Sequence, residues 1–279
     1  MILKLLILLF VLMVLVGGNR GLDSFLALAR TVIAFIVNVY LITWGMPPLF
    51  TTFLVSVFFV ITVLYSQNGK NVKMDAAVMA VTLVLFVIAL TSGPILWRAG
   101  MSGYNEVEQY EEISMYLSPN LAIPMSAVSL SAVMLGLLGA IMDTAVAITT
   151  AVHEVYVNQK DLSEKQLVQS GMTVGRDILG TTVNTLFFAG LGESIMLAVL
   201  FMKNEDTVSV ILNSKALFQE VSGIAIGAIG CLLIIPLSSI LIAHFLKNSE
   251  ENGSKKPDLL QKCYNYIKKH LKNIKKMVQ

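Results

Sequence analysis

Residues 170–192 read S-G-M-T-V-G-R-D-I-L-G-T-T-V-N-T-L-F-F-A-G-L-G, an apolar, glycine-rich run that nevertheless holds adjacent Arg176 and Asp177. Thr181 and Asn184 add polar groups further along the same run. A charge in a lipid-like segment is costly, so such a residue normally faces protein or water and has a role. The stretch therefore predicts a membrane-embedded helix with one polar face.

The composition of the whole chain is that of a membrane protein. Hydrophobic residues make up 56% of the 279 residues, the mean hydropathy is +0.75, and charged residues are only 14%, against about 25% in soluble domains. Two cysteines, Cys231 and Cys263, provide neither a disulfide framework nor a four-cysteine zinc site. We expect no metal and no cofactor, a polytopic membrane domain over residues 1–246, and a basic tail over 247–279.

The apolar runs predict an all-α membrane protein, a bundle of about seven transmembrane helices whose sixth helix is broken or interrupted by glycines. A cleaved signal peptide is the alternative for the first run, but residues 17–20 make a poor cleavage site. The predicted spans are Leu5–Val16, Leu26–Trp44, Leu49–Tyr65, Asp75–Trp97, Leu121–Thr150, Thr173–Met202 and Val221–Leu246.

Lysine placement predicts the orientation, because short cytoplasmic segments carry an excess of Lys and Arg. The tail after Leu246 is rich in lysine, so we expect a cytoplasmic C-terminus. Counting back places the loops with Lys70 and Lys160 inside, and the acidic loop around Glu108 and the N-terminus outside. Lys4 argues weakly against this orientation.

The tail also predicts a basic amphipathic helix. Leu260, Ile267, Leu271 and Ile274 follow helical spacing with lysines around them. Such a helix lies on anionic lipid. Nucleic acid is a poor alternative, because the stripe is apolar. The expected membrane-surface residues are Lys262, Lys268, Lys269, Lys272, Lys275 and Lys276.

Ser163 and Gln166 have the spacing of a capping box just before the sixth span. They predict a helix start there, leading into the span.

The sixth span offers the clearest candidate for a polar path. Asp177, Thr181, Asn184 and Phe188 follow i, i+4, i+7, i+11 and so share one helical face. Glycines between 171 and 192 resemble the breaks that line substrate sites in transporters. In the alternative interpretation Arg176 and Asp177 mark the membrane interface, and the polar groups bond to neighbouring helices.

Two further acidic residues join the candidate path. Asp143 lies on the fifth span beside a face of small residues that includes Gly136, which equally fits a plain packing seam. Glu193 follows the glycines of the sixth span, deep in its outer half. We also expect Asp143 and Arg176 to form an ion pair at the cytoplasmic end of the bundle.

Signatures of enzymes are missing. His153 and Glu154 are not followed by the second histidine of H-E-x-x-H, and there is no Walker A, G-x-S-x-G or dinucleotide fingerprint. Asp143 and Asp177 could share a proton as an aspartyl pair, but neither has a protease-like sequence around it. We expect that the protein is not an enzyme.

Four stretches together resemble the YibE/F-like family of bacterial membrane proteins: Gly17–Leu26, Leu135–Ile148, His153–Leu162 and Ser170–Gly192. The chain is similar to the shorter kind of member. The resemblance implies the cytoplasmic membrane of a bacterium and a longer family member, or a further copy, as partner. It implies no reaction.

Two function classes remain open. The first is a permease-like transport component that acts with the longer member and uses a polar path. The second is a non-transporting scaffold or partner subunit in which the same residues hold helices together. The path would consist of Asp143, Arg176, Asp177, Thr181, Asn184 and Glu193.

Overall fold

The computed structural model describes residues 1–98, 125–203 and 207–251. Within these residues the chain forms eight helices and no strand, which confirms the all-α prediction. The helices are α1 (Ile2–Thr43), α2 (Pro48–Asn68), α3 (Val72–Arg98), α5 (Met125–Asn158), α6 (Glu164–Glu193), α7 (Ile195–Lys203), α8 (Val208–Leu212) and α9 (Lys215–Glu251).

Five of these helices are long and apolar enough to cross a membrane, and a sixth crossing results if α6 and α7 count as one span bent by 46°. The protein is therefore a multi-pass membrane protein. The count differs from the expected seven at the N-terminus, where the 40-residue stretch Lys4–Thr43 counts as one candidate span and not as two.

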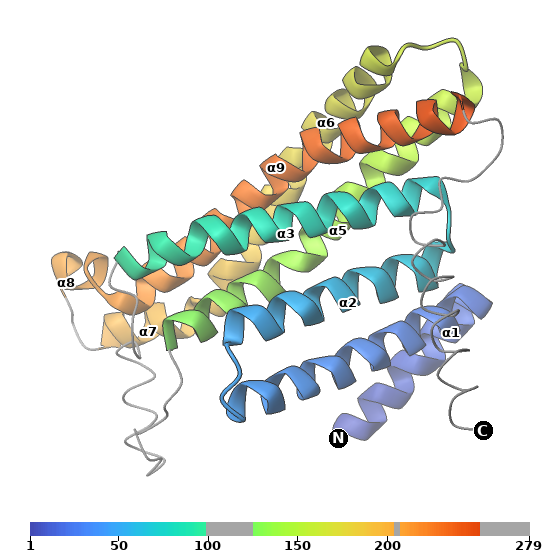
Figure 1. Cartoon of the computed structure of the whole chain (residues 1–279). Coiled ribbons are helices and arrows are strands. Elements are labelled where there is room, and N and C mark those ends of the chain that lie inside the picture. Colours follow the sequence, from blue (N-terminus) through green and yellow to red (C-terminus); the bar gives the residue numbers. More distant parts are fainter. Residues whose placement is uncertain (99–124, 204–206, 252–279) are drawn as a thin grey trace, which may run out of the picture.

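That stretch is not a straight rod. Gly18 has a φ of 55° and a ψ of −133° inside α1, and the rings of Phe10 and Phe25 lie 4.9 Å apart. In a straight helix, 15 residues would separate these two positions by about 22 Å. The backbone of Gly21 also packs against that of Met13. Helix α1 is therefore a hairpin of two antiparallel arms that turns at Gly18, as the blue ribbon shows (Figure 1).

The core of the bundle lies where α3, α5 and α9 meet. Ile88, Ile141 and Ile234, one from each helix, are buried there. Helix α2 packs on α3 and α5, and α1 packs mainly on α2, so the hairpin is peripheral. Helix α6 covers the other side and packs against α9 and α5 (Figure 1).

Helix α6 begins where the sequence predicts. The Ser163 backbone N–H donates to Oε1 of Gln166 (2.9 Å), and the Gln166 N–H donates to Oγ of Ser163 (3.4 Å). Both halves of the capping box are present.

The predicted break in the sixth span is present as the bend between α6 and α7, but it follows Glu193 and does not fall among the glycines of residues 171–192. The helix is continuous from Glu164 to Glu193, and the bend follows it. Gly171, Gly175 and Gly190 are instead buried against α9. They let two membrane helices approach closely, as small residues do at such interfaces.

Gly171 gives a direct test of this packing. A Cβ at Gly171 would lie 2.8 Å from Cβ of Ser239 and 2.9 Å from Cγ2 of Val152, whereas one at Gly180 meets nothing within 4 Å. We expect Gly171→Ala to destabilise the protein by about 1 kcal/mol or more through overpacking. Gly192→Ala on the same helix, where a Cβ also meets nothing within 4 Å, should be neutral or slightly stabilising, because alanine favours helix. Unfolding in an SDS titration measures both; equal midpoints would contradict the packing role.

Some expectations fall outside the described residues. The acidic loop around Glu108 and the tail lysines from Lys255 onward, with the amphipathic helix and its lipid contacts, belong to 99–124 and 252–279. The expected domain boundary after Leu246 falls inside α9, which continues to Glu251.

Candidate functional site

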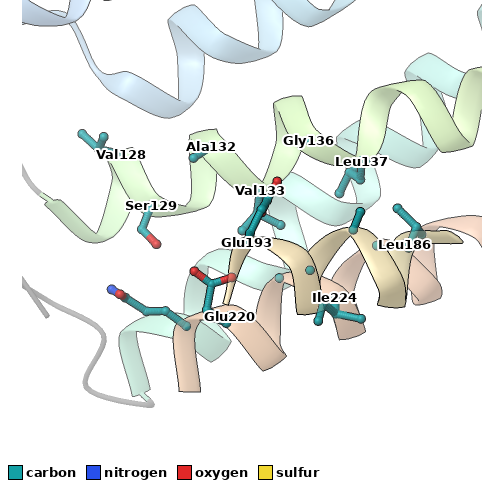
Figure 2. A pocket seen from close by; sticks show the side chains of 15 residues that line it. Val128, Ser129, Ala132, Val133, Gly136, Leu137, Leu186, Glu193, Glu220 and Ile224 are labelled. Carbon is teal, nitrogen blue, oxygen red and sulfur yellow. The ribbon is translucent and has the colours of Figure 1, made fainter. Parts of the chain in front are cut away.

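A cavity of about 400 Å³ opens between α5, α6 and α9, near the end of the bundle where α6 bends into α7. Its lining is mostly apolar and small, with a few polar groups on α5, α6 and α9 (Figure 2). The residues that line it are Val128, Ser129, Ala132, Val133, Gly136, Leu137, Leu186, Ala189, Gly190, Glu193, Gln219, Glu220, Gly223, Ile224 and Gly227.

Helix ends and glycines create this space. Helix α6 stops at Glu193, where the Ser194 N–H donates to the carbonyl of Gly190 (2.9 Å). Gly190 is buried against Ile224 of α9, which holds the two helices together just below the bend. Gly136 on α5 leaves room on the opposite wall.

Two carboxylates belong to the cavity. Glu193 comes from the end of α6 and Glu220 from the start of α9, and their charges lie close enough to interact (Figure 2). The Ser194 hydroxyl is within hydrogen-bonding contact of Glu220 and 2.8 Å from the carbonyl oxygen of Gly190. A hydroxyl has one proton, so it can donate to only one of these acceptors at a time.

Glu193 is the one residue of the expected path that lines this cavity. Glu220 was missed by the sequence analysis, which placed it at the edge of a loop before the seventh span. The signal that the sequence did offer was the position of the two residues relative to the predicted spans. The end of one span and the start of the next lie at the same face of the bundle, so an acidic residue at each can meet.

The other members of the expected path do not line this cavity, so the single polar path stays a prediction. Their side chains lie on the outside of the bundle and are exposed. They are Asp143 on α5 and Arg176, Asp177, Thr181 and Asn184 on α6.

The shared face on α6 is nevertheless present. Asp177, Thr181, Asn184 and Phe188 are all exposed, while Gly175 on the opposite side is buried. The hydroxyl of Thr181 donates to the carbonyl of Ile178 in its own helix (2.8 Å). Within the described residues this hydroxyl therefore does not bond to a neighbouring helix.

The expected ion pair between Asp143 and Arg176 is not formed. A contact at ion-pair distance joins His244 and Glu164 instead, at 3.5 Å. Asp143 and Arg176 also lie away from the helix ends that the link between α5 and α6 joins. Asp143 is 15 residues before the end of α5 at Asn158, or about 22 Å, and Arg176 is 12 residues after the start of α6, or about 18 Å.

At the other end of the bundle, polar side chains of neighbouring helices contact each other. Tyr65 donates to Asp75 (2.7 Å), and the Lys247 ammonium lies over the ring of Tyr156 at 5.9 Å. Among the residues that the structure describes, no three His, Cys, Asp or Glu side chains could hold a metal ion together.

Comparison with known proteins identifies a family. Residues 5–248 match the family model described as YibE/F-like protein. No curated protein and no solved structure matches the chain. Since the family model covers nearly all of the described helices, the chain belongs to the YibE/F-like family.

Proposed function

We propose that this protein is a transport component of the permease type that takes a small cationic solute, or a solute moved together with a proton, into the cavity between α5, α6 and α9. The observation that carries the proposal is the pair of carboxylates, Glu193 and Glu220, in that cavity.

Physical chemistry supports a cationic occupant. Two carboxylates held close together repel each other, and a cation or a bound proton relieves that repulsion. Intramembrane ionisable groups commonly mark ion and substrate pathways. A cavity of about 400 Å³ is at the small end of the range for ligand sites.

The bend after Glu193 supports the same proposal. A helix that breaks near the end of a span leaves backbone groups that a substrate or a moving segment can use. Here the break falls beside the cavity, between Glu193 and Ile195.

We further propose seven crossings in the cytoplasmic membrane of a bacterium, with the two arms of the α1 hairpin crossing separately. The links between α2 and α3 and between α5 and α6 lie at one end of the bundle, together with the end of α9 (Figure 1). Lys70, Lys73, Lys160, Lys165 and Lys247 belong to this end. The positive-inside rule places it, and the tail, in the cytoplasm.

The outward polar face of α6 favours a second candidate function, a scaffold or partner subunit that transports nothing itself. Charged groups at mid-helix need a protein or water neighbour. A longer family member or a further copy of the chain would supply one. Both functions require a partner, so transport is best assayed with the longer member co-expressed.

Flux into proteoliposomes tests the transport proposal. The purified protein, with and without the longer member, is screened with a panel of small cations and zwitterions and with a pH-sensitive dye for protons. We expect Glu193→Gln and Glu220→Gln each to reduce the flux at least about fivefold, because each removes a charge that holds the cation.

Glu154→Gln is the matched control, because Glu154 is exposed on α5 and does not line the cavity. It should leave the flux unchanged. If no member of the panel is transported by the wild-type protein with its longer relative, or if all three variants behave alike, the scaffold function replaces this proposal.

A further inference from the structure

The outer face of α6 is the least membrane-compatible surface of the described chain. We define it as Arg176, Asp177, Gly180, Thr181 and Asn184, all of which are exposed. Asp177 lies 13 residues after the start of α6 at Glu164 and 26 residues before the end of α7 at Lys203, so it is about 20 Å from the nearer end of the bent span. A bilayer core is about 30 Å thick, so these side chains sit at membrane depth.

Within the described chain the charged groups and the amide of this face have no polar partner. Neither Arg176 nor Asp177 forms an ion pair with a described residue, and the Asn184 side chain has no described hydrogen-bond partner. A charge in contact with lipid costs several kcal/mol at the bilayer centre. Something polar must therefore cover the face in the membrane.

We propose that a second copy of this chain covers it, so that α6 and its counterpart form the centre of a two-fold dimer. The face is complementary to itself. It offers one cation, one anion and one amide that both donates and accepts, all within nine residues from Arg176 to Asn184.

The helical positions fit a parallel pair. Taking 100° per residue, Asn184 lies about 180° from the buried Gly175, and so at the centre of the outer face. An amide there can bond its own copy across the two-fold axis, as interhelical Asn does in membranes. By the same measure Arg176 lies about 80° to one side of this line and Asp177 about 20° to the other. In a parallel pair the opposite flanks of two helices meet, so Arg176 faces Asp177 of the second copy.

The surroundings allow close approach. A Cβ at Gly180 would meet nothing within 4 Å, so no other described side chain covers the middle of the face. Beside it, α5 exposes Gly136, Gly139 and Ala147 along the same side as Asp143. Small residues let the second copy come near enough for its polar groups to pair. Lipid offers no cation and anion at this depth, which is why a second copy fits better.

Charge exchange between two differently tagged copies tests the dimer. Arg176→Asp makes the face acidic, and Asp177→Arg makes it basic. Each variant alone should lose at least about tenfold in co-purification of its two tags from mild detergent, since interhelical polar pairs contribute about 1–2 kcal/mol in membranes. Arg176→Asp co-expressed with Asp177→Arg should recover the wild-type level, because each acidic face then meets a basic one.

Lys165→Asp is the control, since Lys165 is exposed at the loop end of the same helix. It should leave co-purification unchanged. Loss in both single variants without recovery in the mixed pair would overturn the proposal, as would no loss at all.

A second measurement does not depend on how the charge variants fold. Asn184→Cys, in a chain whose Cys263 is replaced by serine, should form a disulfide-linked dimer when membranes are oxidised. Leu90→Cys on the exposed side of α3 should not. A crosslink from residue 184 only to a longer protein would identify the longer relative as the occupant and refute the second copy. Neither measurement involves flux, so this proposal and the transport proposal can fail separately.

Discussion

Gly18→Val should destabilise the N-terminal hairpin by about 1–3 kcal/mol, a shift of about 5-fold to 150-fold in its folding equilibrium. Gly18 turns the chain with a φ of 55° and a ψ of −133°, a region that is essentially closed to residues with a Cβ and most of all to β-branched ones. Space is not the problem, because a Cβ at Gly18 would meet nothing within 4 Å.

The strain energy at residue 18 can be compared with the free energy needed to open the hairpin. Straightening the 40-residue stretch Lys4–Thr43 would give a rod of about 60 Å, twice the thickness of the bilayer core. One apolar arm would then leave the membrane, at about 0.8 kcal/mol for each CH₂ exposed. That loss far exceeds 1–3 kcal/mol, so the arms should stay antiparallel, with a looser turn.

Crosslinking measures the turn directly. The rings of Phe10 and Phe25 are 4.9 Å apart, so cysteines introduced by Phe10→Cys and Phe25→Cys should be joined by a short bifunctional thiol reagent. We expect Gly18→Val to slow this crosslinking and to lower the midpoint of SDS unfolding. Gly17→Val is the control, because Gly17 has open space and is not among the glycines with a positive φ. Equal effects of the two valines would show that Gly18 is not the turn residue.

The sequence was sufficient for the helices but not for the role of every glycine. Capping and apolar runs predict where α2, α3, α6 and α9 lie, because both depend on neighbours along the chain. Glycines look alike in a sequence. Gly18 turns the chain, whereas Gly171 and Gly175 lie inside a continuous helix and admit α9. Only the partner helix distinguishes these roles.

The candidate site shows the same limit. The spacing of Asp177, Thr181 and Asn184 predicts a shared face, and the face exists. Periodicity cannot say whether a polar face points into the bundle or away from it, because that depends on which sides α5 and α9 occupy. It points away. The two carboxylates of the cavity, Glu193 and Glu220, come instead from the end of α6 and the start of α9. The way these helices fold back on each other brings the two residues together.

Gly230→Leu should be among the most damaging single substitutions, because Gly230 lies where the three central helices meet. A Cβ there would come within 2.8 Å of Cδ1 of Ile141 on α5 and 3.1 Å of Cδ1 of Ile88 on α3. A single methyl could be accommodated by moving those flexible tips. Leucine adds three further carbons, for which the neighbours leave no volume, since Ile141 is completely buried and Ile88 almost so.

The cost can be bounded from overpacking in other cores, about 1–3 kcal/mol and occasionally more. We expect the upper end here. Relief requires α9 to move away from α3 and α5 together, and that movement would open the contacts of Cys231 and Ile234 in the same core. The folded yield should fall at least about tenfold, with aggregation in place of a monodisperse peak in size-exclusion chromatography.

Ala225→Leu separates overpacking from a general effect of bulk on α9. Ala225 is exposed on the same helix, so leucine there adds a side chain to the surface without displacing the core. Its folded yield should stay near the wild-type level. If Gly230→Leu also folds normally, then α3, α5 and α9 do not pack around Gly230 as described. The cavity that α9 forms with α5 and α6 would lose its support at the same time, because the same helix builds both.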